Sequence, residues 1–319
     1  MRVFITALLL IIFSACKPEL GEPASLIQEP AILAVRGIPA EAAPLSLVSY
    51  EVLVATPDGS MLEVAADWAL CKTAKPPSEP GPISEACLTD GVSLLAEATS
   101  NITAEIPYDA CQLFGPDVPP QSADEPPGRP RDPDVTGGYY QPVRVTIPTS
   151  DGDMVAFGFE RISCNPGNAA IDVALQYKEQ YQPNNAPELS SVWAKIDGKE
   201  QSETTRVIDG VVPDNLLHVP RHANITLGVS WPQEAVETFP VYNLTTQKIN
   251  QTREAMRVSW FSNAGQWAHD RTGRDSNASE TWTSNNLTTP STSGLIHIWA
   301  VLRDNRGGVD WLETVLMVD

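Results

Sequence analysis

Residues 295–318 read LIHIWAVLRDNRGGVDWLETVLMV and carry the strand pattern that decides the fold. Two runs rich in Val, Ile, Leu and Trp flank residues 304–308, whose Asp, Asn and Gly favour a turn. The pattern predicts two long strands, 295–303 and 309–318, joined by that turn. Because successive side chains of a strand point to opposite faces, Ile296, Ile298, Ala300 and Leu302 share one face, which suits a sandwich core.

The opposite face of the first of these strands carries His297, Trp299 and Arg303. If the aliphatic face fills a core, this second face needs an explanation of its own. One interpretation is that an earlier domain or a loop covers it. The other is an exposed aromatic platform that binds a glycan or a protein. These three residues are therefore the candidate binding face.

Short strands separated by turn residues recur along the whole chain, which contains 28 Pro and 20 Gly. Such a composition favours strands and turns over long helices. Besides a first strand around Val35, the predicted strands are residues 46–56, 65–71, 140–148, 154–164, 171–177, 189–196, 224–231 and 257–261. Residues 245–256 are the best candidate for one short helix. The predicted fold class is all-β, with strands arranged in sandwiches.

A polar stretch with two prolines at 182–188 is the best domain boundary. It divides the chain into a first sandwich over residues 31–181 and a second over residues 189–319. Residues 76–82 and 115–133 are rich in proline and lack periodicity, which indicates loop insertions in the first sandwich. Such loops often present a binding surface on a rigid sandwich.

The cysteine count favours disulfides in the first sandwich. Of five cysteines, setting Cys16 aside leaves Cys71, Cys87, Cys111 and Cys164, an even set that can pair completely. The pairs Cys71–Cys87 and Cys111–Cys164 would close the bases of the two insertions. Four cysteines permit three connectivities, so this pairing remains a hypothesis.

The N-terminus has the form of an export signal. Arg2 precedes an apolar run to Phe13, which is too short for a stable membrane anchor. The small residues before Cys16 resemble the lipobox of bacterial lipoproteins, although Phe13 stands where leucine is favoured. The resemblance implies cleavage of a signal peptide at 1–15, acylation of Cys16 and a tether over residues 16–30. Lys17, in place of an aspartate, implies the outer membrane. The alternative is an ordinary secretory signal cut near Ala15.

The C-terminal residues also carry a resemblance. The motif at residues 258–260 with Gly265, Trp282 before Pro290, and residues 299–304 with the glycine pair 307–308 look like bacterial Ig-like domains of the PKD kind. The match covers mainly residues 257–319, and it implies a β-sandwich without indicating a function. The layout of a lipobox and two such Ig-like domains is similar to uncharacterised surface lipoproteins of the myxobacterial type.

Charge and motifs exclude several classes of function. The net charge of −19 argues against nucleic acid as a partner. The sequence has no nucleophile elbow, His-Glu-x-x-His, glycine-rich phosphate loop or Cys-x-x-Cys. His218 and His222 are separated by Pro220, which favours extended chain over a helical metal site. Asp151 and Asp153 supply too few oxygens for a calcium loop. We expect no catalytic residue, metal or cofactor.

Together these features predict a non-enzymatic, lipid-anchored protein of the cell envelope that acts as a structural or protein-interaction module. It would contact the membrane through its acyl chains, on the periplasmic side or at the cell surface, with envelope proteins or glycans as partners. The alternative is a carbohydrate-binding or adhesive surface lipoprotein that uses the aromatic face or the loops. An enzyme with unrecognised residues is a third hypothesis.

Overall fold

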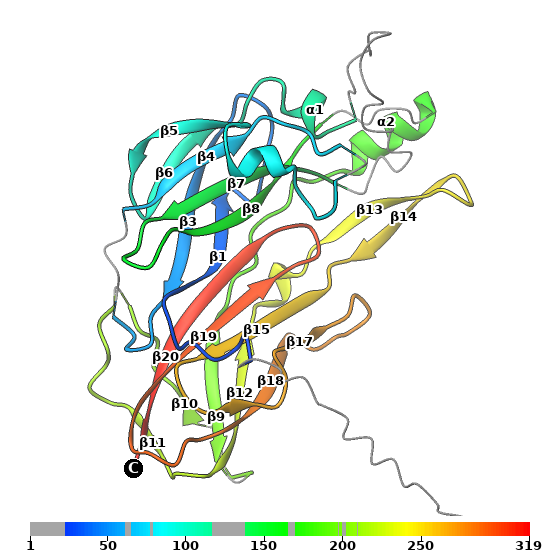
Figure 1. The fold of residues 1–319 in the computed structure, drawn as a ribbon. Helices are drawn as coiled ribbons and strands as arrows, with labels where there is room; N and C mark the ends of the chain where they lie inside the picture. The colour runs from blue at the N-terminus through cyan, green and yellow to red at the C-terminus, as the bar shows by residue number, and fades with distance from the viewer. Residues whose placement is uncertain are drawn as a thin grey trace, which may run out of the picture.

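The computed structural model describes residues 23–60, 65–76, 79–116, 138–164, 170–196, 198–199, 202–208 and 210–319. These residues form two β-sandwiches, with the first above the second in Figure 1. The predicted all-β sandwich fold is confirmed. The predicted signal peptide and Cys16 lie outside the described residues. Within the described ranges, no helix has the length and hydropathy needed to span a membrane.

The first sandwich consists of a three-stranded and a five-stranded sheet. The smaller sheet has the order β1 (Ala31–Ile38), β3 (Leu47–Ala55) and β6 (Asn101–Glu105). The larger sheet has the order β2 (Glu41–Ala42), β8 (Met154–Ile162), β7 (Tyr139–Ile147), β4 (Asp67–Cys71) and β5 (Val92–Ala98). Trp68, Tyr50 and Tyr139 are the largest buried side chains in the core between the two sheets. The predicted hairpin of residues 140–164 corresponds to β7 and β8.

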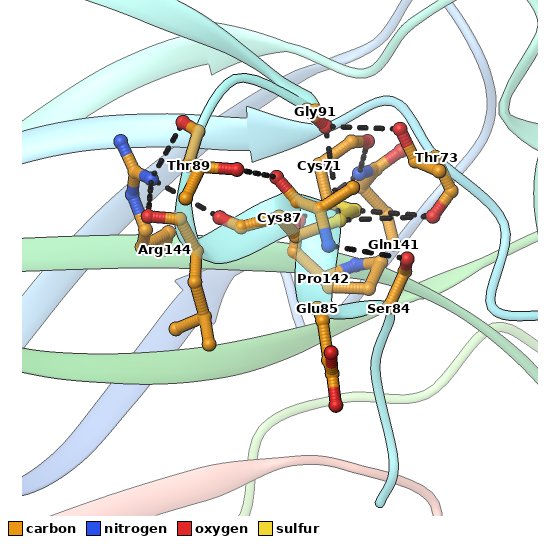
Figure 2. Close-up of a disulfide and its surroundings, with 12 residues drawn as sticks. Cys71, Thr73, Ser84, Glu85, Cys87, Thr89, Gly91, Gln141, Pro142 and Arg144 are labelled. Atoms are coloured by element: carbon orange, nitrogen blue, oxygen red, sulfur yellow. Dashed lines mark hydrogen bonds between the residues drawn. A yellow bond between two sulfur atoms is a disulfide. The ribbon is translucent and has the colours of Figure 1, made fainter. Parts of the chain in front are cut away.

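Both expected disulfides are present, joining Cys71 to Cys87 and Cys111 to Cys164. Figure 2 shows the first bridge, which attaches the short 3-10 helix η1 (Glu85–Leu88) to the outer face of the larger sheet. Arg144 of β7 donates to the carbonyls of Cys87 (3.1 Å) and Leu88 (2.9 Å). The second bridge links the helix α1 (Ala110–Leu113) to the chain just after β8. The bridges therefore fasten η1 and α1 to the sandwich, whereas most of the predicted insertion at residues 115–133 lies outside the described residues.

Two predictions of secondary structure are wrong. Residues 171–177, expected as a strand, belong to helix α2 (Ile171–Gln180), which buries Val173 and Tyr177 four residues apart on one face. Residues 245–256, expected as a helix, contain β14 (Lys248–Arg253), which pairs with β13 (Thr238–Asn243). The Asn243 side chain accepts the backbone N–H groups of Thr245 at 3.0 Å and Thr246 at 2.9 Å, which stabilises the turn between the two strands.

The second sandwich consists of two five-stranded sheets. One has the order β10 (Ser202–Glu203), β9 (Ser191–Ile196), β12 (Asn224–Ser230), β18 (Trp282–Thr288) and β16 (Gln266–Trp267). The other has the order β11 (Leu217–Val219), β20 (Val309–Val318), β19 (Gly294–Arg303), β15 (Met256–Ser262) and β17 (Arg271–Arg274). The predicted terminal hairpin is β19–β20, and its aliphatic face fills the core as expected. The short 3-10 helix η2 (Gln233–Ala235) precedes the β13–β14 ribbon.

The two sandwiches pack directly against each other. Strands β1 and β3 lie on the outer face of the sheet that contains β15, β19 and β20 (Figure 1). Trp299 is 2% exposed and packs with Ile27 and Ala55. The predicted tether contributes to this body, because the N–H of Ile27 donates to the carbonyl of Ser262 at 2.8 Å. The first sandwich and the chain before it therefore cover the Trp299 face.

This packing overturns the expectation of an exposed platform at His297, Trp299 and Arg303. His297 is 3% exposed and its Nδ1 lies 2.7 Å from a Glu313 carboxylate oxygen, whereas Arg303 is half-buried and donates to the carbonyl of Leu33 at 3.1 Å. Strand periodicity correctly predicted that these three side chains share one face. It could not predict that the first sandwich covers that face. The interpretation that an earlier domain covers this face agrees with the structure.

Replacing Trp299 by alanine tests this packing. We expect Trp299→Ala to lower the free energy of unfolding by about 3–5 kcal/mol, because it leaves a large cavity between the sandwiches. Urea unfolding of the purified protein measures the change. Trp282→Ala is the matched control, since Trp282 is 41% exposed on the far sheet and its removal should change stability much less. Equal losses of unfolding free energy in the two variants would contradict the burial of Trp299 between the sandwiches.

Candidate functional site

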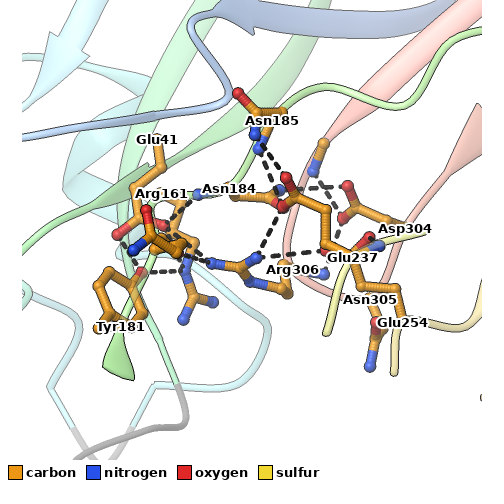
Figure 3. Close-up of polar contacts among 12 residues, drawn as sticks. Glu41, Arg161, Tyr181, Asn184, Asn185, Glu237, Glu254, Asp304, Asn305 and Arg306 are labelled. Atoms are coloured by element: carbon orange, nitrogen blue, oxygen red, sulfur yellow. Dashed lines mark hydrogen bonds and ion pairs between the residues drawn. The ribbon is translucent and has the colours of Figure 1, made fainter. Parts of the chain in front are cut away.

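The most densely connected polar site lies at the junction of the two sandwiches. We define the junction charge cluster by its carboxylates and guanidinium groups, namely Glu41, Glu237, Glu254, Asp304, Arg161 and Arg306 (Figure 3). Its members come from both sandwiches and from the base of the β13–β14 ribbon. The site therefore joins segments that are far apart in the sequence.

Arg306 lies at the centre of this cluster and is 1% exposed. Its guanidinium lies 3.0 Å from a Glu237 oxygen, 3.4 Å from Glu254 and 3.5 Å from Glu41. It also donates to the carbonyl of Gln182 at 2.7 Å. A buried guanidinium needs such partners, because an unpaired charge out of water is strongly unfavourable.

The turn between β19 and β20 positions Arg306. The Asp304 carboxylate accepts the backbone N–H groups of Arg306 at 2.7 Å and of Gly308 at 2.8 Å. Gly307 has φ +103°, a conformation that side chains other than glycine rarely adopt. The Asp-Asn-Arg-Gly-Gly sequence, which is predicted as a turn, therefore also orients the Arg306 side chain into the junction.

Glu41 is the partner contributed by the first sandwich. Its carboxylate lies 3.2 Å from the Arg161 guanidinium and accepts the hydroxyl of Ser163 at 2.7 Å. It also accepts the hydroxyl of Tyr181 and, at 2.9 Å, the backbone N–H of Asn184. The Asn184 side chain in turn donates to Asp304 at 3.1 Å, so this residue of the predicted linker is buried between the sandwiches, whereas Gln182, Pro183, Asn185 and Glu188 are exposed.

The electrostatics of the cluster favour protonation of part of its carboxylates. Four carboxylates share two guanidinium groups, so the cluster carries an excess of negative charge when all of them ionise. Burial, followed by the negative charge of Asp304, raises the pKa of Glu254 to about 7. Burial also raises the pKa of Asp304. These carboxylates are held in ion pairs or hydrogen bonds within the interface. The arrangement therefore suits a fixed interface better than acid–base catalysis.

The histidines and aspartates weighed from the sequence lie apart from this cluster. His218 is exposed and its Nδ1 lies 2.7 Å from an Asp319 oxygen, whereas His222 occupies a turn with φ +53°. Asp151 and Asp153 lie in the exposed β7–β8 turn. In the described residues, no group of three or more His, Cys, Asp or Glu side chains is arranged to hold a metal ion.

A second site, which the sequence reasoning missed, lies on the outer face of the β9–β12–β18 sheet. The rings of Trp193 and Trp282 meet edge to face with centroids 5.9 Å apart. The Trp193 ring lies flat over Gly228. Only glycine fits at position 228, because a Cβ on this residue would overlap the Trp193 ring. Arg274 lies 4.8 Å from the Trp282 ring centroid, and Trp282 is the exposed member of the pair. The alternation of Thr226, Gly228 and Ser230 with apolar residues is the sequence pattern that could have predicted this polar outer face.

Comparison with known proteins gives little beyond the fold. No protein-family model matches the chain, and no curated protein matches it in sequence. Among solved structures, the D0–D1 domain of intimin is 9% identical, with 90% of this chain and 96% of that chain covered and a TM-score of 0.20. Carbohydrate-binding modules of the β-sandwich superfamily are 8% identical, with 93% and 100% covered and a TM-score of 0.21. At these TM-scores the likenesses carry no argument about function.

The raised pKa of Glu254 predicts a pH dependence of stability. Because the folded pKa of about 7 exceeds the ordinary 4.5, the folded state keeps its proton where the unfolded state loses it. Stability contributed by this group is therefore full below about pH 4.5 and falls as pH rises to about 7, by up to ~1.4 kcal/mol per pH unit. We expect Glu254→Gln to flatten this part of the profile.

Urea unfolding between pH 4.5 and 8 measures the two profiles. Glu105→Gln provides the control, because Glu105 lies exposed on β6 outside the cluster. Its profile should run parallel to that of the wild type. A Glu254→Gln profile that is also parallel would show that Glu254 does not carry the shift.

Proposed function

We propose that this chain is a non-enzymatic, lipid-anchored protein of the bacterial outer membrane, in which the two sandwiches act together as one rigid structural or protein-interaction module. The observation that carries the proposal is the buried interface between the sandwiches. It combines the apolar contacts of Trp299 with the ion pairs of Arg306. Glu41 and Arg306 form a buried ion pair between the sandwiches at 3.5 Å, and a flexible pair of domains would not need such a contact.

A third contact supports the rigid arrangement. Arg36 of β1 reaches the second sandwich, where its guanidinium lies 2.6 Å from Asp310 and 3.9 Å from the ring centroid of Trp311. The same guanidinium pairs with Glu51 at 2.7 Å in its own sandwich. The interface is therefore fixed at its apolar centre and at two separate polar positions, which resists both hinge and twist motions.

The N-terminal contacts would keep the folded body near the membrane if Cys16 carries the lipid. The Ser25 hydroxyl donates to Asp270 at 2.8 Å, and the carbonyl of Ser25 accepts the N–H of Ser262 at 2.9 Å. If Cys16 is acylated, only the residues between Cys16 and Ser25 separate the lipid from the folded body. Fully extended, they span about 30 Å. The module would then stand close to the bilayer.

Replacing Cys16 tests the anchor. We expect Cys16→Ser to move the protein from the membrane fraction to the soluble periplasmic fraction and to abolish labelling with radioactive palmitate, because the acylated thiol is gone. Glu19→Ser, three residues beyond, is the control and should stay in the membrane fraction. A wild-type protein without label, or a Cys16→Ser protein that stays in the membrane fraction, would contradict lipid anchoring.

Carbohydrate binding is the second candidate function, and the Trp193–Trp282 pair favours it. An exposed indole beside hydroxyl and amide side chains offers an apolar surface with hydrogen-bonding groups around it, which suits a sugar ring. Thr226 and Asn286 lie on the same face, where the Thr226 hydroxyl donates to the Asn286 side chain at 2.8 Å. This face is also free of the first sandwich, unlike the face of Trp299.

Trp282→Ala tests this second function. We expect the variant to lose at least tenfold in retention by envelope polysaccharides in affinity electrophoresis while keeping its unfolding midpoint. Leu295→Ala is the control, because Leu295 is similarly exposed on the other sheet. Retention that does not change in Trp282→Ala, or that falls equally in both variants, would exclude this face as a glycan site.

A further inference from the structure

A cavity of about 310 Å³ lies between the edges of the first sandwich. It runs along β1 from Ile32 to Gly37 and along the part of β8 from Ala156 to Glu160. The second sandwich closes one side with Arg303, among others. At ~30 Å³ per water, the volume corresponds to about ten water molecules, which is enough for a small ligand.

Both strands beside the cavity have an unpaired edge there. In the described part of the chain, β1 pairs only with β3, and β8 pairs with β7 on one side and with β2 only at Arg161 and Ile162. Two glycines let the strands approach, since a Cβ on Gly37 would overlap the Glu160 carboxylate and one on Gly158 would overlap Val35. Unpaired strand edges can bind an extended chain through backbone hydrogen bonds.

One end of the cavity carries a buried acid without a counter-charge. Glu160 is 2% exposed, and neither of its carboxylate oxygens has a hydrogen-bond partner among the described residues. The hydroxyl of Tyr50, which also lines the cavity, has none either. Burial, followed by the charge of Glu41, raises the pKa of Glu160 to about 8. A buried polar group without a partner is costly, and a cation here would relieve that cost.

The other end of the cavity carries a guanidinium without an anion. Arg303 donates to the carbonyl of Leu33 at 3.1 Å and to the Ser259 hydroxyl at 3.5 Å, and both partners are neutral. No ion pair joins it to a carboxylate in the described ranges. Burial, followed by the charge of Arg271, lowers the pKa of Arg303. An anionic group here would offset both the burial of the Arg303 charge and its repulsion by Arg271.

We propose that this cavity binds a small zwitterion, a short peptide with free termini, whose ammonium pairs with Glu160 and Tyr50 and whose carboxylate pairs with Arg303. The two charged positions contact β1 at Gly37 and Leu33, four residues apart, or about 13 Å at ~3.3 Å per residue. An extended dipeptide spans about 7 Å, which leaves about 3 Å, a hydrogen-bond length, at each end. This binding activity goes beyond the proposed structural role, and it rests on that role in one respect, since Arg303 lines the cavity only while the sandwiches are packed.

Isothermal titration calorimetry of the full chain with dialanine tests the proposal, with N-acetyl-dialanine and dialanine amide as blocked probes. We expect dialanine to bind and each blocked peptide to bind at least tenfold more weakly. Glu160→Gln should remove the preference for a free amine, and Arg303→Gln the preference for a free carboxylate. Glu105→Gln, an exposed carboxylate on β6, is the matched control and should behave as the wild type.

A proton count separates binding at Glu160 from a merely structural effect. Because Glu160 holds its proton at pH 7, pairing with an ammonium should release close to one proton. Titration in buffers of different ionisation enthalpy measures this release, which Glu160→Gln should abolish. The variant keeps the shape of the side chain and removes a buried acid, so we expect it to fold, as a thermal melt will show.

Three results would overturn the proposal. They are no heat with any of the three peptides, equal affinity for free and blocked peptides, and equal affinity and proton release in the wild type and Glu160→Gln. None of them bears on the interface between the sandwiches or on lipid anchoring, so this proposal can fail while the proposed function stands.

Discussion

The buried guanidinium of Arg306 is the contact on which the placement of the two sandwiches depends. It is surrounded by carboxylates from both sandwiches and from the β13–β14 ribbon, and by a carbonyl of the segment that connects the sandwiches. A buried ion pair adds little net stability when compared with well-packed apolar groups, yet leaving one member without its partner is severely unfavourable. The cluster therefore acts mainly through orientation, because Glu41 pairs with Arg306 only when the two sandwiches are placed in this way.

The apolar part of the interface works differently. Trp299 contributes buried apolar surface, which stabilises the contact between the sandwiches without selecting one relative rotation of the two. Arg36 selects a rotation, since it must reach Asp310 and Trp311 together. Because this interface occupies the outer face of the β15–β19–β20 sheet, the outer face of the β9–β12–β18 sheet is the broad face of the second sandwich left for a partner. The same packing that buries one aromatic residue thus leaves Trp282 as the accessible one.

The sequence predicted well those elements whose local pattern matches their final environment. The β19–β20 hairpin was placed nearly to the residue because a Gly-rich turn separates two strongly alternating runs. The two disulfides followed from an even cysteine count and from loops that needed closing. Helix α2 was missed because its buried face has only Val173 and Tyr177, while the apolar Ile171 and Leu175 are exposed. The junction charge cluster could not be predicted, since Glu41 and Arg306 look like ordinary surface residues until distant segments bring them together.

The proposed ligand cavity and the interface share structural elements, so the two are physically coupled. Arg303 ends β19 and Arg306 lies in the turn that follows, and the first lines the cavity while the second fills the junction. Glu160 and Arg161 are neighbours on β8 that point to opposite faces, and the charge of Glu41, paired with Arg161, acts on Glu160. A cation at Glu160 would therefore also change the field at Glu41. Since the wall containing Arg303 exists only while the sandwiches stay packed, a ligand that needs both charges binds the packed form alone and stabilises it by mass action.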